Sequence, residues 1–143
     1  MTGATSPLVA RVATTQATFD RFKDAPFKLG KNDCARMVAF HLRAMGVRVR
    51  LAKAGSYTTA LAARRALKRA GFASLSDALD CHGLLRVPPA SAMVGDVVAL
   101  PAADDFGALT ISLGNGRVLG YHEAAEGAVA MQPSEFVAAW RVP

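Results

Sequence analysis

The sequence predicts an α+β fold, in which N-terminal helices pack on a C-terminal antiparallel sheet. Up to about residue 82, apolar residues recur at helical spacing. From Leu84 onward the apolar residues alternate, in runs of strand length separated by Gly, Pro and Asn. Helices followed by strands are typical of α+β proteins. We therefore expect one domain over 1–143, with a helical part at about 7–82 and a sheet part at about 84–143.

Four helices are expected in the first half of the chain. Pro7 suits the first turn of a helix over 7–23, and Pro26 ends it. Its apolar stripe is expected to be Leu8, Val12, Thr15, Phe19 and Phe22. A largely buried helix over 33–45 starts at Asn32 or Asp33 and stops at Gly46. Residues 47–54 are an edge strand or an extended connection, and helices follow at 59–70 and 74–80.

The second half reads as a sheet. Strands are expected at 84–87, 97–100, 109–113, 117–122, 128–131 and 140–142. Asn115-Gly116 favours a type I′ turn and hence a hairpin between two of these strands. The turn over 92–96 is expected to be capped by Asp96, and Pro133 to start a last short helix.

The composition limits the function classes. The chain has 143 residues, 52% of them hydrophobic, which is enough for a sizeable core. No apolar stretch approaches the roughly 20 residues of a membrane span. The N-terminus lacks the basic and apolar regions of a secretory signal, so we expect a soluble chain made in the cytoplasm.

A net charge of +6 raises the possibility of nucleic-acid binding. The basic residues are spread along the chain, however, and no aromatic residues are interleaved with the densest cluster as in a base-stacking surface. Nucleic acid is therefore disfavoured. That cluster is a solvated helix face, or a surface that docks on acidic proteins or on peptidoglycan carboxylates, and consists of Arg64, Arg65, Lys68 and Arg69.

Cys34 stands at the start of the helix over 33–45, where unpaired backbone N–H groups and the helix dipole favour a thiolate. His41 is two turns further along, on the order of 10 Å away, and is expected to be a core residue rather than the base for the thiol. Cys34 and Cys81 are expected to be thiols. The spacing of cysteines and histidines gives little support to a metal site, and we expect no metal and no cofactor.

This order of elements resembles the NlpC-type cysteine peptidases, compact papain-like enzymes that cut cell-wall peptides. Three segments carry the resemblance. Residues 32–34 (Asn-Asp-Cys) match the nucleophile step, and residues 94–98 (Val-Gly-Asp-Val-Val) match the entry to the first core strand. Residues 109–118 (LTISLGNGRV) match the strand and hairpin that carry the other catalytic residues. Phe-x-x-Gly-x-x-Asp-Cys at 27–34 and Ala-Trp-Arg-Val at 139–142 are similar to a small branch from phage and prophage tail modules.

The resemblance implies a catalytic histidine at the position of Ala108 and a third polar residue at that of Gly120. Neither alanine nor glycine can accept a proton or orient an imidazole. His122, two residues beyond Gly120, is the alternative base. The same strand face would carry it, displaced by about 6–7 Å, which is more than productive geometry tolerates.

The leading hypothesis is a structural or adaptor protein of a phage tail tip, built on a catalytically degenerate NlpC-like domain that binds neighbouring tail proteins. It would reside in the virion tail after assembly in the host cytoplasm. The alternative is an active cysteine peptidase or amidase that cleaves peptidoglycan during phage entry, with Cys34 as the nucleophile and His122 as the base. A basic nucleic-acid-binding module is a third, weaker option.

Overall fold

A computed structural model describes residues 6–28, 32–49, 59–101, 108–121 and 127–143. Four helices come first, as the sequence predicts: α1 (Pro7–Phe22), α2 (Cys34–Ala44), α3 (Ala60–Arg69) and α4 (Leu75–Cys81). Three of them begin at a side chain that accepts a hydrogen bond from the first turn, and these caps are Asp33 for α2, Thr59 for α3 and Ser74 for α4. In the described part of the chain, no helix is long and apolar enough to cross a membrane.

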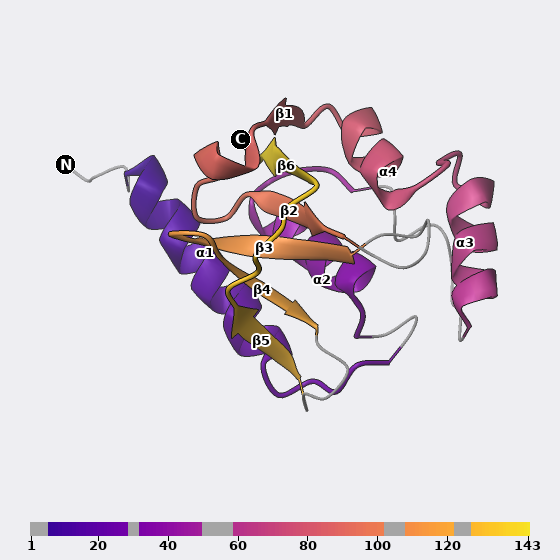
Figure 1. Ribbon diagram of the computed structural model, residues 1–143, viewed down its shortest axis with the longest axis horizontal. Coiled ribbons are helices and arrows are strands. Elements are labelled where there is room, and N and C mark those ends of the chain that lie inside the picture. The colour runs from indigo at the N-terminus through magenta and orange to yellow at the C-terminus, as the bar shows by residue number, and fades with distance from the viewer. Residues whose placement is uncertain (1–5, 29–31, 50–58, 102–107, 122–126) are drawn as a thin grey trace.

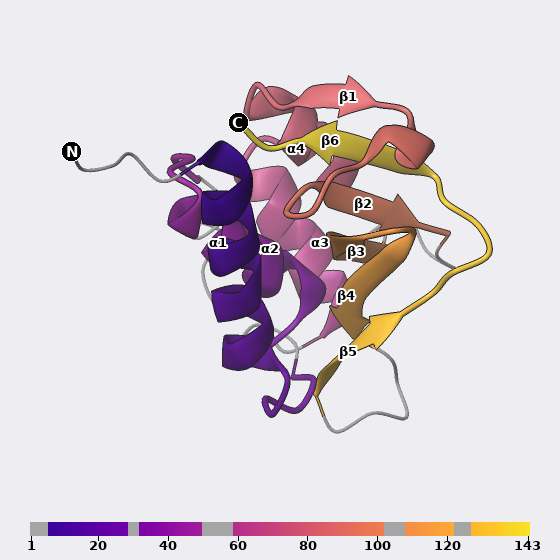
Figure 2. The same ribbon diagram turned by 90° about the vertical axis from the view of Figure 1, so that its left-hand side faces the viewer.

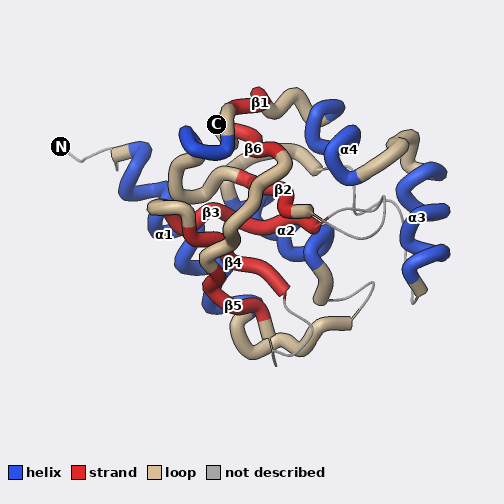
Figure 3. Tube along the Cα trace, in the orientation of Figure 1, coloured by secondary structure: helices blue, strands red, loops and turns tan. Residues whose placement is uncertain are grey.

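The strands form one antiparallel sheet, which confirms the α+β prediction. They are β1 (Leu85–Val87), β2 (Val97–Leu100), β3 (Ala108–Gly114), β4 (Arg117–Tyr121), β5 (Ala128–Met131) and β6 (Ala138–Arg141), with a 3₁₀ turn over Pro89–Ser91. Their order in the sheet is β1-β6-β2-β3-β4-β5, so the last strand lies between the first two. The helices gather on one side of this sheet (Figures 1, 2 and 3).

The main core lies between the helices and the sheet. It is centred on α2, whose buried residues include Met37, Val38 and Leu42, and on the facing strand residues Leu109 and Ile111. A smaller apolar cluster on the opposite face of the sheet consists of Val98, Val118 and Ala139. Alternate strand residues therefore serve different cores, which is the period-two pattern that the sequence shows.

The apolar stripe predicted for α1 is wrong at its N-terminal end. Leu8 and Val12 are 54% and 50% exposed, and the helix instead buries Arg11, Thr15, Thr18 and Phe22. The buried face is rotated toward the polar residues because Arg11 binds partners in the turn before β2 and at the C-terminal end of the chain. An apolar flank of α1 is thereby left at the surface.

The β3–β4 hairpin is confirmed. Asn115 has a φ of 54° and Gly116 a φ of 77°, and two consecutive positive φ angles are what a type I′ turn requires. Gly95, in the turn before β2, also has a positive φ, and a Cβ atom there would lie 3.2 Å from Thr15 Oγ1. A glycine at this position lets the turn approach α1 closely.

The short helix predicted at Pro133 is absent from the described residues, because residues 132–137 must cross the sheet. The chain leaves β5 at one edge and enters β6 beyond β4, β3 and β2, a distance of about 19 Å at 4.8 Å per strand. Six extended residues span about 20 Å, whereas a helix of that length spans about 9 Å. Val137 N–H donates to Ala99 O at 2.9 Å as the segment arrives. Figure 1 shows the crossing on the face away from α2.

Two further boundaries differ from the sequence prediction. The last strand is Ala138–Arg141 rather than 140–142, because its register is fixed by pairing with β1 and β2 on either side. Residues 47–49 form no strand, and 50–54 lie outside the described residues.

Candidate functional site

The candidate site is centred on Cys34, the first residue of α2. Asp33 is the N-cap, and its Oδ1 accepts the Arg36 N–H at 2.8 Å, which decides between the two predicted caps. The Cys34 thiol is half-buried and faces the start of β3, and the backbone N–H groups of Leu109 and Ala35 are directed at its sulfur. The helix start, the thiol and strand β3 thus lie together in the structure.

The surroundings of Cys34 keep its thiol protonated at neutral pH. The pKa of Cys34 is raised to about 11, chiefly by burial, and the neighbouring Asp33 carboxylate acts in the same direction. The amides of Leu109 and Ala35 lower the pKa but do not offset the burial. A nucleophilic cysteine needs the opposite shift.

Tyr121 is the second titratable side chain beside Cys34. Burial raises the pKa of Tyr121 to about 12, with smaller contributions in the same direction from Asp33 and Cys34. Its hydroxyl donates to Ala25 O at 3.3 Å, and its ring makes edge contacts with Phe22 and Phe27. The phenol therefore stays neutral, and its ring forms one aromatic side of the site together with Phe22 and Phe27. Its position next to the His122 candidate was the only sequence signal for this role.

Ala108 and Gly120, the two family positions, both lie in the sheet. Ala108 alternates with Leu109, whose side chain packs with α2, so Ala108 shares the opposite face with Thr110. A Cβ atom at Gly120 would lie 2.7 Å from Met131 Cε and 2.8 Å from Thr110 Cγ2. A glycine at position 120 is thus required by packing, and a larger side chain would not fit without displacing Thr110.

The histidines do not complete a catalytic pair within the described residues. His41 is fully buried, with Nδ1 2.8 Å from Thr18 Oγ1 and Nε2 2.8 Å from Gly95 O. His82 contacts Ala78 O and the ring of Phe72. His122, the predicted alternative base, lies outside the described residues. No cluster of three His, Cys, Asp or Glu side chains suited to a metal ion occurs in the part that the structure describes.

Asp96 acts as a structural anchor. Its Oδ2 accepts Met93 N–H at 2.8 Å and Arg141 Nε at 2.9 Å, and its Oδ1 accepts Val142 N–H at 3.0 Å and a short bond from Arg11. Capping of the turn was predicted from the sequence, whereas the pairing with Arg11 and Arg141 was not. An arginine interrupting the apolar spacing of α1 was the available signal.

Comparison with known families places the chain without assigning an activity. Residues 10–142 match DUF6950, a domain of unknown function. The chain belongs to the DUF6950 family. No curated protein matches it.

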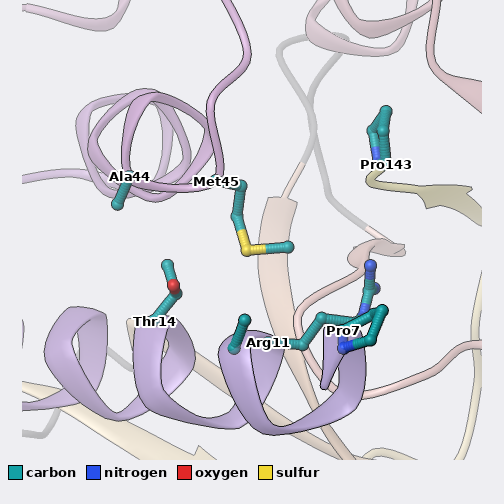
Figure 4. A pocket seen from close by; sticks show the side chains of 7 residues that line it. Pro7, Arg11, Thr14, Ala44, Met45 and Pro143 are labelled. Carbon is teal, nitrogen blue, oxygen red and sulfur yellow. The ribbon is translucent and has the colours of Figure 1, made fainter. Parts of the chain in front are cut away.

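A pocket of about 240 Å³ lies at the other end of α2 in this DUF6950 chain, about 15 Å along the helix from Cys34. Figure 4 shows Thr14 of α1 and Met45, the residue that caps the C-terminal end of α2, pointing into it. It is lined by Pro7, Ala10, Arg11, Thr14, Ala44, Met45 and Pro143. Its charged residue, Arg11, is already bonded to Asp96, Val94 O and Val142 O, so the pocket offers shape without a catalytic group.

The predicted interaction surface lies on a different helix from Cys34. Arg64, Arg65, Lys68 and Arg69 of the DUF6950 chain are all exposed on α3. Trp140, in the closing Ala-Trp-Arg-Val segment, is fully buried. Its Nε1 donates to Asp80 Oδ1 at 2.9 Å, and the Arg86 guanidinium lies 5.0 Å from its ring centroid. It is a core residue.

Proposed function

We propose that this chain is a non-catalytic binding domain on a papain-like, NlpC-type scaffold, and that it works as a structural adaptor in a phage tail tip. In this role it binds neighbouring tail proteins, is assembled in the host cytoplasm and remains in the virion tail. The resemblance of residues 27–122 and of the closing Ala-Trp-Arg-Val to the phage tail-module branch supports the setting.

One observation carries the non-catalytic part of the proposal. Cys34 occupies the place of a nucleophile and has backbone amides directed at its sulfur, but its described titratable neighbours are Asp33 and Tyr121. Neither takes the thiol proton at neutral pH: the Asp33 carboxylate acts to raise the pKa of the thiol, and the Tyr121 phenol, whose pKa is raised to about 12, is itself protonated and cannot accept a proton. Ala108, the position at which the resemblance implies a histidine, has no ring and lies on the face of the sheet away from α2.

Alkylation of Cys34 by iodoacetamide tests this directly. The Cys81→Ser variant reports Cys34 alone, and Cys34→Ser reports the exposed Cys81 as an accessible reference. With a pKa of about 11, Cys34 is expected to react at pH 7 about a hundredfold or more slowly than a thiol with a pKa of about 8.5, and its rate should keep rising above pH 9. A rate for Cys34 that levels off below pH 8 would contradict the proposal, because it would reveal a paired thiolate.

An active cysteine peptidase or amidase is the second candidate. The N–H groups of Leu109 and Ala35 favour it, since they could stabilise a thiolate or an oxyanion at Cys34. Release of peptide fragments from purified peptidoglycan, abolished by both Cys34→Ala and His122→Ala, would establish this candidate in place of the adaptor. We expect no fragments above those of a heat-denatured control.

A further inference from the structure

Helix α3 carries the most concentrated charge of the described chain. Its ten residues include four basic and no acidic side chains, and all four basic side chains are exposed. The helix lies at the periphery of the molecule, on the opposite side from α1 (Figure 1). Its inner face is held by Ala63, Ala66 and Leu67, which are at most 5% exposed. The basic face is therefore presented by a well-anchored helix.

The charges on α3 lack counter-charges among the described residues. No described ion pair involves the four basic residues. The carboxylates of neighbouring α4 are used elsewhere: Asp77 accepts Ala73 N–H, and Asp80 binds Arg86 and Trp140. Arg64 and Lys68, like Arg65 and Arg69, are four residues apart, so each pair repels on the helix surface. An acidic partner would relieve this repulsion.

Leu61 adds an apolar element to the same face. It is 56% exposed, and all four basic residues lie within about 80° of it around the helix axis. Arg64 and Lys68 lie on one side of the leucine around the helix axis, and Arg65 and Arg69 lie on the other. A phosphate backbone offers nothing to cover a leucine, whereas an amphipathic protein helix offers both an apolar side chain and carboxylates.

We propose that the exposed face of α3 docks an acidic amphipathic helix of another protein. An apolar side chain of that helix covers Leu61, and its flanking carboxylates pair with the four basic residues. This inference rests on the proposed adaptor function, because it specifies the partner that the adaptor binds. The pairing is electrostatically steered and salt-dependent, with the leucine contact fixing its register.

The probe is a synthetic, fluorescently labelled helical peptide with glutamates flanking one central leucine. Binding to the full chain is measured by fluorescence anisotropy at low and at physiological ionic strength. Comparison probes are the same peptide with glutamines for the glutamates, the same peptide with serine for the leucine, and a duplex DNA. The test variants are Arg64→Glu with Lys68→Glu, the milder Arg64→Gln with Lys68→Gln, and Leu61→Ser. Arg48→Glu with Arg117→Glu gives the same change of net charge at exposed positions elsewhere.

The α3 double reversal is expected to weaken binding of the acidic peptide at least about tenfold, and the control reversal less than about twofold. Leu61→Ser should weaken binding about fivefold for the leucine peptide and leave the serine peptide unchanged. Equal losses in the two double reversals would overturn the proposal in favour of net charge alone. Tighter binding of the duplex, insensitive to Leu61→Ser, would overturn it in favour of a polyanion site. Trp140 emission identifies any variant that has not folded. If the Arg64→Glu with Lys68→Glu variant does not fold, the Arg64→Gln with Lys68→Gln variant is used in its place.

These outcomes are separable from the proposed function. A peptidoglycan hydrolase whose α3 still binds the peptide would overturn the adaptor function and leave the α3 site intact. A chain with an inert Cys34 and no affinity for the peptide would retain the non-catalytic proposal and remove the α3 site.

Discussion

At the scale of single residues, His41 is a titratable side chain with a structural role in the core. Gly95 O can only accept, so Nε2 of His41 carries a proton. Burial lowers the pKa of His41, and the Arg11 charge lowers it further, so the ring is neutral. In this form Nδ1, 2.8 Å from Thr18 Oγ1, accepts the Thr18 hydroxyl in competition with Thr14 O, which lies 3.1 Å from the same oxygen. The ring thereby joins α1, α2 and the turn before β2 through two hydrogen bonds.

This predicts a loss of stability in mild acid. Because the pKa of folded His41 lies below its unfolded value of about 6.5, the unfolded chain binds the proton first. The contribution of His41 to the free energy of unfolding is therefore complete above pH 6.5 and is lost as the pH falls below it. Urea titrations between pH 8 and 5 should show this fall for the wild type.

His41→Gln is the matched control for that titration. It lacks the titrating ring, so its curve should be flatter over the same range, at a cost of about 1–3 kcal/mol at pH 7.5 for the altered hydrogen bonds. Parallel curves for the wild type and the variant would show that other groups account for the acid sensitivity.

The residue scale also shows what the sequence could predict about the site. The position of Cys34 follows from local signals, since Asp33 caps the helix and the apolar run after it is buried against the sheet. The chemical state of Cys34 does not, because its pKa depends on burial and on the backbone amide of Leu109 in β3, which is distant in sequence. From the sequence alone, Gly120 is interpreted as a lost catalytic residue. In the structure, the close packing of Thr110 and Met131 explains why a glycine stands there.

At the scale of elements, α1 is held by polar contacts more than by its apolar residues. Arg11 reaches across to Val94 O, Val142 O and the buried Asp96, while Leu8 and Val12 remain exposed. Periodicity located the helix correctly, because spacing and Pro7 are local. The same periodicity predicted the wrong buried face for this helix, because the ion pair from Arg11 to Asp96, which is far along the chain, sets how the helix is rotated about its axis.

Arg11→Ala is therefore expected to cost about 3–5 kcal/mol of unfolding free energy, since it leaves Asp96 buried with half of its ionic partners. Leu8→Ala and Val12→Ala, on the same helix, should each change it by no more than about 0.5 kcal/mol. Urea unfolding followed by circular dichroism measures all three. A larger cost at Val12 than at Arg11 would mean that α1 buries the face predicted from the spacing.

At the scale of the whole molecule, the first helix contacts the segment that follows the last strand. β6 enters between β1 and β2, and Val142 then binds both Asp96 and Arg11 of the first helix. Trp140 on β6 binds Asp80 of α4 and packs in the core that α2 shares with the sheet. Sequence patterns predicted strands of the right type, but the insertion of the last strand depends on long-range pairing that no local pattern contains.

These contacts predict that the helical and sheet parts unfold together. Trp140 is the single tryptophan and is fully buried, so its emission should shift to longer wavelength when β6 leaves the sheet. Far-UV circular dichroism at 222 nm (the helix band) should follow the same urea transition, with coincident midpoints. Arg11→Ala should lower both midpoints equally, because Arg11 joins the first helix to the last strand. A helical signal that persists after the tryptophan shift is complete would instead mean that residues 7–82 hold their structure without the sheet.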